Sequence, residues 1–245
     1  MPVESDLPIP VRLNASGPLT GPSALISGID AVLVPQGAEY QAVVRALPPN
    51  GPLVVPLAIG PAQAQALALS LKERHWRRVL ITGVCGSLAP NYGIGTVGVY
   101  EGSVNGTDSE LCDPTLTSAL LTALPEAVAV RGLTTERVLC QVAEKRSAQQ
   151  TSGAQVVDME SYPLLQELSA AGVAVAVLRV VSDDCQHDLP DLNTAIDAQG
   201  QLQPLALAWQ LLCQPLAGYQ LVRGSLRSLR VLQQTLRCLF PAQPQ

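Results

Sequence analysis

Three carboxylates, Glu39, Glu160 and Asp183, each come shortly after a run of apolar residues. A carboxylate at the end of a buried strand can move a proton or stabilise a developing cation on a small substrate, because small ligands bind at the carboxyl ends of strands in α/β sheets. Acidic residues also favour the first turn of any helix, so the position alone allows a structural role as well.

A glycine pair is the second feature that could contact a ligand. Gly83 and Gly86 enclose Val84 and Cys85 directly after the apolar run 79–82. Two glycines so close together let backbone amides approach a ligand, or simply form a tight turn. The spacing is neither a Walker nor a dinucleotide fingerprint, and the six scattered cysteines form no zinc signature. We therefore expect no metal and no cofactor.

The segments that position these groups alternate between strand and helix patterns, which predicts an α/β fold with a mixed, largely parallel central sheet. Strands are expected at 31–35, 53–59, 79–82, 96–100 and 173–178, with a further strand region at 133–142 that contains a loop at 134–137. Helices are expected at 39–47, 62–74, 113–124 and 161–171, and from residue 205 onward with a break near Pro215.

The length of 245 residues and the lack of an internal linker predict a single domain, 1–245. Residues 1–30, rich in proline, are expected to form an irregular N-terminal arm, and 205–245 a C-terminal helical extension. The basic amphipathic segment 221–240 could lie on a membrane surface, but we favour packing on its own domain.

Composition restricts the partners. Hydrophobic residues make up 47% of the chain and charged residues only 14%, so we expect a homo-oligomer that hides apolar surface. The net charge is −5, without a basic cluster that could follow a phosphate backbone, so nucleic acid is excluded as a partner. Without a signal peptide, a membrane span or a disulfide framework, we expect a cytoplasmic protein.

Five short motifs occur in an order that resembles the nucleoside phosphorylase superfamily, which contains purine nucleoside phosphorylases and methylthioadenosine/S-adenosylhomocysteine nucleosidases. They are Ala58-Ile59-Gly60-Pro61, Thr82-Gly83-Val84-Cys85-Gly86-Ser87-Leu88, Ile94-Gly95-Thr96-Val97, Val157-Asp158-Met159-Glu160-Ser161 and Arg179-Val180-Val181-Ser182-Asp183. The resemblance runs from about Ala31 to about Asp188. The tail, with Asp188-Leu189-Pro190, is more similar to the hopanoid-associated phosphorylase branch.

The resemblance implies a three-layer α/β/α sandwich and cleavage of the N-glycosidic bond of a purine nucleoside or an adenosylated metabolite. It implies that Glu160 and Met159 bind the ribose and that Asp183 is the general acid on the leaving base. By a looser alignment, Glu39 matches the glutamate that activates water in the nucleosidases. The chemistry agrees, because a leaving purine needs a proton and leaves a cationic, oxocarbenium-like sugar that a carboxylate stabilises.

The chain departs from the family at two places. Ile81 and Val84 stand where phosphorylases have a phosphate-binding arginine and serine, and Arg137-Val138 stand near the place of the base-stacking aromatic. Phosphate could still be bound by the backbone of Gly83–Ser87, or by Arg137 or Arg179, as a co-substrate. Water is the rival nucleophile. A degenerate member that binds a ligand or partner without catalysis is the alternative function.

Overall fold

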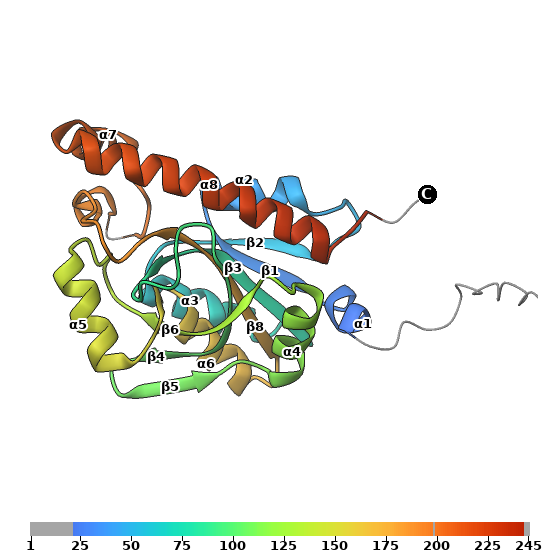
Figure 1. Cartoon of the computed structure of the whole chain (residues 1–245). Helices are drawn as coiled ribbons and strands as arrows, with labels where there is room; N and C mark the ends of the chain where they lie inside the picture. The colour runs from blue at the N-terminus through green and yellow to red at the C-terminus, as the bar shows by residue number, and fades with distance from the viewer. Residues whose placement is uncertain (1–21, 198, 243–245) are drawn as a thin grey trace, which may run out of the picture.

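A mixed β-sheet forms the centre of the protein, and helices flank it, as in an α/β fold (Figure 1). The structure is a computed structural model that describes residues 22–197 and 199–242. Its strands are β1 (Ala31–Pro35), β2 (Leu53–Leu57), β3 (Arg78–Ser87), β4 (Val97–Asn105), β5 (Asp108–Leu111), β6 (Val128–Thr134), β7 (Val156–Asp158) and β8 (Ala174–Asp183). Its helices are α1 (Pro22–Ser27), α2 (Ala38–Ala46), α3 (Pro61–Leu71), α4 (Pro114–Ala123), α5 (Val142–Ser152), α6 (Ser161–Ala170), the short 3-10 helix η1 (Leu192–Ala195), α7 (Pro204–Cys213) and α8 (Pro215–Leu239).

Strand pairing closes part of the sheet on itself. β2, β1 and β3 are parallel neighbours at one edge. β3 also pairs in parallel with β8, and its last two residues pair in antiparallel with β7. β4 pairs with both β8 and β6, and β6 pairs with β7, so the path returns to β3. The register between β3 and β8 shifts between Cys85 and Gly86. The carboxyl ends of β3, β7 and β8 therefore meet in one place.

Alternate residues of the central strands point to opposite faces of the sheet, and both faces are apolar. In β8, Val177 and Val181 pack into one buried cluster, and Leu178 and Val180 into the other. Arg179 stands between Val177 and Val181, so a guanidinium takes a position that the strand pattern reserves for an apolar side chain. A charge buried in this way requires partners.

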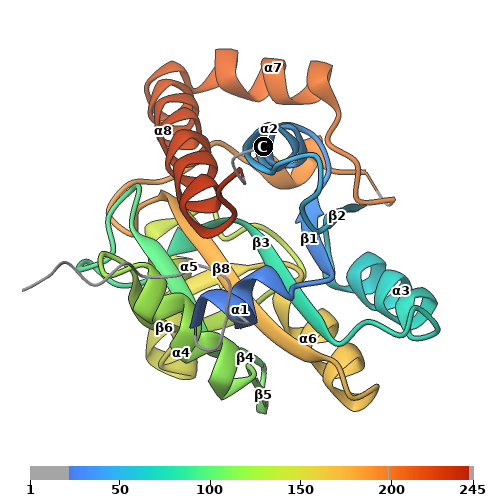
Figure 2. The ribbon, with the colours of Figure 1, turned by 90° about the vertical axis from the view of Figure 1, so that its right-hand side faces the viewer.

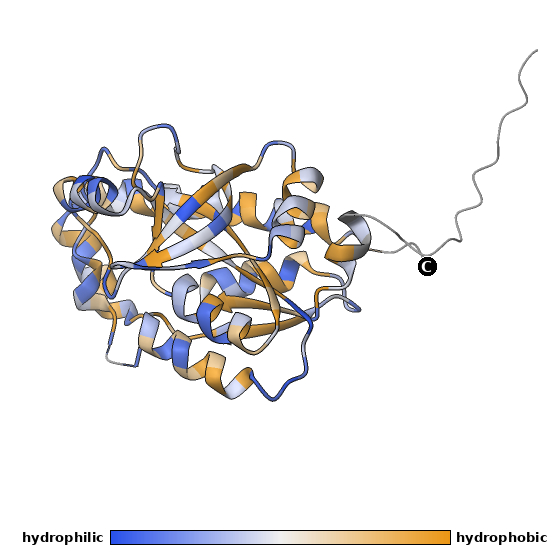
Figure 3. Cartoon of the chain, turned by 90° about the horizontal axis from the view of Figure 1, so that it is seen from below, coloured by the Kyte–Doolittle hydropathy of each residue, from blue (hydrophilic) through white to orange (hydrophobic). Residues whose placement is uncertain are grey.

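The helices divide between these two clusters. α3 and α6 contribute to the cluster of Val177, whereas α1, α2, α4 and α8 contribute to that of Leu178 (Figure 2). α8 packs closely on the end of β8, because Gly224 has no side chain where a Cβ would collide with the carbonyl oxygen of Ser182. The apolar residues, orange in Figure 3, run through the central strands, and many outer loops are hydrophilic.

Two segments differ from the prediction, and one lies mostly outside the described residues. The glycine segment Gly83–Ser87 is no loop but the second half of β3, because β8 and β7 continue to pair with it. The strand region expected at 133–142 was wrong: β6 ends at Thr134, and α5 begins at Val142. Of the arm expected at 1–30, residues 1–21 lie outside the described part, and α1 follows.

Candidate functional site

Asp158 organises the turn that joins β7 to α6. Its buried carboxylate accepts hydrogen bonds from the backbone amides of Glu160 (3.1 Å) and Ser161 (3.0 Å) and from the Ser161 hydroxyl (2.5 Å). The Thr134 hydroxyl, at the end of neighbouring β6, donates another at 3.0 Å. These amides begin a helix and have no partner within it, so Asp158 replaces the missing acceptors. The turn fixes the position of the next carboxylate, Glu160.

Arg179 of β8 is the countercharge of this turn and is 1% exposed. Its guanidinium lies 3.1 Å from Glu160 Oε2 and 3.5 Å from Asp158 Oδ2, and it donates to the carbonyl oxygen of Val84 at 3.1 Å. Burial alone lowers the pKa of Arg179, but the carboxylates of Asp158 and Glu160 outweigh burial and raise it. The guanidinium is therefore charged, and the two carboxylates and the Val84 carbonyl oxygen are among its partners.

Glu39 reaches the same cluster from the first turn of α2. Its Oε2 accepts a hydrogen bond from the Val84 amide at 2.7 Å, and it has room because a Cβ on Gly83 would collide with this oxygen. The residue as a whole is only partly buried, but burial of its carboxylate raises the pKa of Glu39 to about 7, against the opposing effect of Arg179. Burial also raises the pKa of Glu160. A carboxylate with a pKa near 7 can exchange a proton at neutral pH.

Asp183 ends β8, and Gly86 leaves the space for its carboxylate: a Cβ on Gly86 would lie 2.9 Å from Asp183 Oδ2. The two glycines of the predicted ligand segment thus make room for two carboxylates, those of Glu39 and Asp183. Between them, Cys85 is buried, and burial raises the pKa of its thiol, so it is no thiolate nucleophile at neutral pH.

Lys145 is the residue that sequence reasoning missed. It lies on α5, is 1% exposed, and its ammonium donates to Asp183 Oδ2 and to the carbonyl oxygen of Asp184 at 2.6 Å. The Ser182 hydroxyl lies 3.0 Å from the other carboxylate oxygen, Asp183 Oδ1. A strand was expected where α5 begins, which hid the helix. The available signal was composition, because the chain has only two lysines, Lys72 and Lys145, and a buried lysine must be paired.

The other predicted base-binding residues make their contacts elsewhere. Arg137 has a side chain that is 57% exposed and pairs with Glu144 at 2.5 Å. The backbone of Val138 donates to the side chain of Asn193 at 2.9 Å and accepts from it at 3.1 Å. Within the described residues, neither forms a hydrogen bond or ion pair with Glu160 or Asp183. Their predicted part in base binding therefore stays a prediction without a supporting contact.

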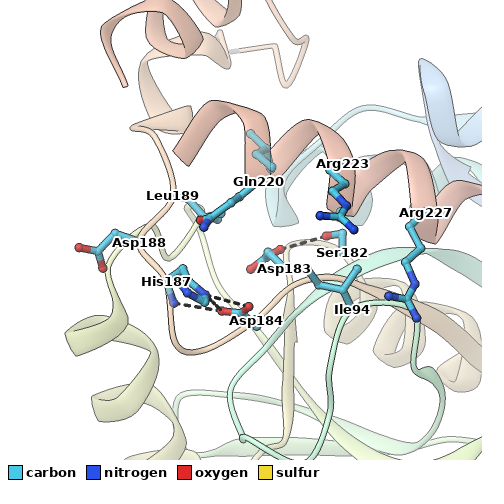
Figure 4. Close-up of a pocket in the computed structure, with 12 residues that line it drawn as sticks. Ile94, Ser182, Asp183, Asp184, His187, Asp188, Leu189, Gln220, Arg223 and Arg227 are labelled. Atoms are coloured by element: carbon cyan, nitrogen blue, oxygen red, sulfur yellow. Dashed lines mark hydrogen bonds and ion pairs between the residues drawn. The ribbon is translucent and has the colours of Figure 1, made fainter. Parts of the chain in front are cut away.

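A cavity of about 200 Å³ opens beside Asp183, between the end of β8 and α8 (Figure 4). Its lining comes from the loop before β4, the end of β8 with the loop that follows, and α8: Ile94, Ser182, Asp183, Asp184, His187, Asp188, Leu189, Gln220, Leu221, Arg223, Gly224 and Arg227. In the described part of the chain, no group of three or more His, Cys, Asp or Glu side chains could hold a metal ion. No helix there is long and apolar enough to span a membrane.

Comparison with known proteins gives one family and a set of structures with the same fold. The sequence profile of the phosphorylase superfamily matches residues 26–211, whereas no curated protein matches the chain in sequence. Futalosine hydrolase of Helicobacter pylori has a TM-score of 0.66 at 14% identity, over 85% of this chain and 95% of that one.

Two nucleosidase structures are similar to the same extent. The 5'-methylthioadenosine/S-adenosyl homocysteine nucleosidase of Helicobacter pylori has a TM-score of 0.65 at 15% identity, over 85% of this chain and 96% of that one. The S-adenosylhomocysteine nucleosidase of Streptococcus pyogenes has a TM-score of 0.64 at 15% identity, over 86% and 97%. At these identities the likeness is one of fold.

Proposed function

The chain belongs to the phosphorylase superfamily, and from that premise we propose that it hydrolyses the N-glycosidic bond of a purine nucleoside or an adenosylated metabolite. The observation that carries the proposal is the hydrogen bond from the Val84 amide to Glu39. It holds a proton-accepting carboxylate, with a pKa of about 7, against the strand where a phosphorylase would need groups that bind phosphate. Such a carboxylate suits the activation of water.

On β3 and β8, the groups that phosphate would need are apolar or already bonded. Ile81 is apolar and fully buried, and the Val84 amide already donates to Glu39. Arg179 is bonded to Glu160 and to the Val84 carbonyl oxygen. An ionised Glu39 would also repel a phosphate dianion at this place. These contacts favour water over phosphate as the nucleophile.

In the proposed reaction, Glu39 takes a proton from the water molecule that attacks C1′ of the ribose. Glu160 stabilises the oxocarbenium-like sugar and binds its hydroxyl groups, beside Met159. The Glu160 carboxylate accepts from the Gly60 amide at 3.3 Å and from Arg179 at 3.1 Å. An ionised carboxylate has about four acceptor sites, so Glu160 retains capacity for ribose hydroxyls.

The leaving base needs a proton, which we assign to the pair of Lys145 and Asp183. The Lys145 N–H bond breaks as an Asp183 O–H bond forms, and Asp183 passes its proton to the nitrogen of the departing base. Lys145 then recovers a proton from solvent, and Glu39 releases to solvent the proton that it took from the attacking water. The net reaction consumes one water molecule. The support is the contact itself, since a buried ammonium touches the carboxylate at the cavity edge.

The test is incubation of the purified protein with adenosine, inosine and 5′-methylthioadenosine, with and without inorganic phosphate, followed by chromatography of free base and sugar. We expect free base and free sugar in both conditions, and loss of release in Asp183→Asn. Release only with phosphate, with a sugar 1-phosphate as product, would replace hydrolysis by phosphorolysis. No release from any of the three, with nucleoside binding intact, would favour the non-catalytic binding protein.

We also propose that the chain forms a homo-oligomer. α7 has no buried side chain among its described residues, and Leu205, Trp209 and Leu212 on it are 88%, 67% and 75% exposed. Apolar area of this kind on one helix is typical of a surface covered by another protein. Light scattering should give a mass above that of one chain, and Trp209→Asp should lower it. A monomeric wild-type protein would contradict the proposal.

A further inference from the structure

The cavity beside Asp183 is lined by charged groups that are unequally paired. Each of its three carboxylates has a partner within the described residues. These partners are Lys145 for Asp183, His187 at 3.0 Å for Asp184, and the Val142 amide at 2.7 Å for Asp188. The carboxylates of the lining therefore accept hydrogen bonds from donors within the protein.

The two arginines of the lining have no such partner among the described residues. Arg223 and Arg227 of α8 line the same cavity, and neither forms a hydrogen bond or ion pair with any residue that the structure describes. They are four residues apart, so they project from the same side of the helix. Figure 4 shows both extending from α8 toward the side of Ser182 and Ile94. The close packing of Gly224 on the Ser182 carbonyl oxygen holds this part of α8 in place.

We propose that Arg223 and Arg227 form a subsite for an anionic group, a carboxylate or a phosphate, carried by the nucleoside substrate at its 5′ position. The inference rests on the proposed function, which gives the base to Asp183 and the ribose hydroxyls to Glu160 and so leaves the 5′ position for the substituent. Guanidinium groups bind carboxylate and phosphate oxygens in bidentate pairs. The charged groups of the cavity that have no partner in the described part of the chain are therefore N–H donors, which the oxygens of a carboxylate or phosphate complement.

The expected effect is moderate, because both arginines are exposed to solvent. Solvent screening places a charge-assisted hydrogen bond of an exposed pair at or below the lower end of its usual strength. Loss of either arginine should therefore weaken binding of an anionic substrate by about tenfold, while a neutral analogue of the same shape binds equally well.

The experiment measures binding by calorimetry in a Glu39→Gln background, where turnover is blocked. The probes are adenosine 5′-carboxylate, the isosteric adenosine 5′-carboxamide and adenosine 5′-monophosphate. We expect the carboxylate or the monophosphate to bind about tenfold tighter than the carboxamide, and Arg223→Gln or Arg227→Gln to remove most of this preference. Whichever anion binds more tightly identifies the source of the charge. Arg230→Gln is the matched control, since it removes the same charge from α8 outside the cavity.

An unchanged preference in both arginine variants would overturn the inference, as would an equal loss in Arg230→Gln or failure to bind any of the three probes. Base release by the wild-type protein is measured separately. If anionic probes bind through the two arginines but no nucleoside is cleaved, the subsite stands and the proposed reaction falls. If nucleosides are cleaved without any preference for the anion, the reaction stands and the subsite falls.

Discussion

Replacing Glu39 by glutamine keeps the shape of the side chain and an oxygen acceptor for the Val84 amide, but it removes the ionisable group. Burial raises the pKa of Glu39 from 4.5 to about 7, so the folded protein binds this proton more tightly than the unfolded chain does. The resulting stability is fully present below pH 4.5 and is lost as pH rises to about 7. At about 1.4 kcal/mol per pH unit, the interval corresponds to up to about 3 kcal/mol.

Urea unfolding at several pH values between 4 and 9 measures this difference. Glu39→Gln should be about as stable as the wild-type protein near pH 4 and more stable by up to about 3 kcal/mol above pH 7, with a constant gap beyond. Glu73→Gln, on an exposed side chain, is the control and should follow the wild-type protein throughout. Two parallel curves for Glu39→Gln and wild type would refute the buried, proton-retaining carboxylate.

The same variant tests the chemistry. If Glu39 must be ionised to accept a proton from water, base release by the wild-type protein should rise with pH through about 7 and then level off. Glu39→Gln should lose about 10²- to 10⁴-fold in rate, the usual contribution of a general base. Retention of wild-type activity by this variant would remove Glu39 from the mechanism.

Three other changes have expected outcomes. Lys145→Met should slow release of adenine from adenosine by at least about tenfold. It should not slow cleavage of 7-methylguanosine, because the cationic base of this substrate leaves without a further proton. Lys72→Met is the control, and equal losses of rate on both substrates would indicate a structural role only. Gly86→Ala should lower the rate of base release, because the new Cβ displaces the Asp183 carboxylate, and an unchanged rate would contradict the crowding. Leu232→Ala, at a fully buried position of α8, should lower the free energy of unfolding by about 2–5 kcal/mol, and a loss below about 1 kcal/mol would mean that α8 packs loosely.

Features carried by one strand were predictable from the sequence. The apolar run that leads into Arg179 and Asp183 indicated a buried strand with charges at its end, and β8 has this form. Features that depend on distant segments were not predictable. No periodicity shows that Lys145, on a helix that was not predicted, pairs with Asp183. Likewise, Gly83 and Gly86 were interpreted as a ligand-binding loop. A glycine indicates space, but the sequence does not show that the carboxylates of Glu39 and Asp183 fill that space.

The register shift between β3 and β8 determines how the two halves of the site are aligned. Arg179 pairs with Gly83 and Asp183 with Gly86, so a step of four residues on β8 spans a step of three, about 10 Å, on β3. The extra residue of β8, Ser182, has no residue opposite it in the register with β3 and lies between the space for Glu39 at Gly83 and the space for Asp183 at Gly86. Deletion of the extra residue, Ser182, would remove this bulge together with the hydroxyl that lies 3.0 Å from Asp183 Oδ1. One irregularity in strand pairing thus sets the position of the proposed acid, Asp183, relative to the proposed base, Glu39.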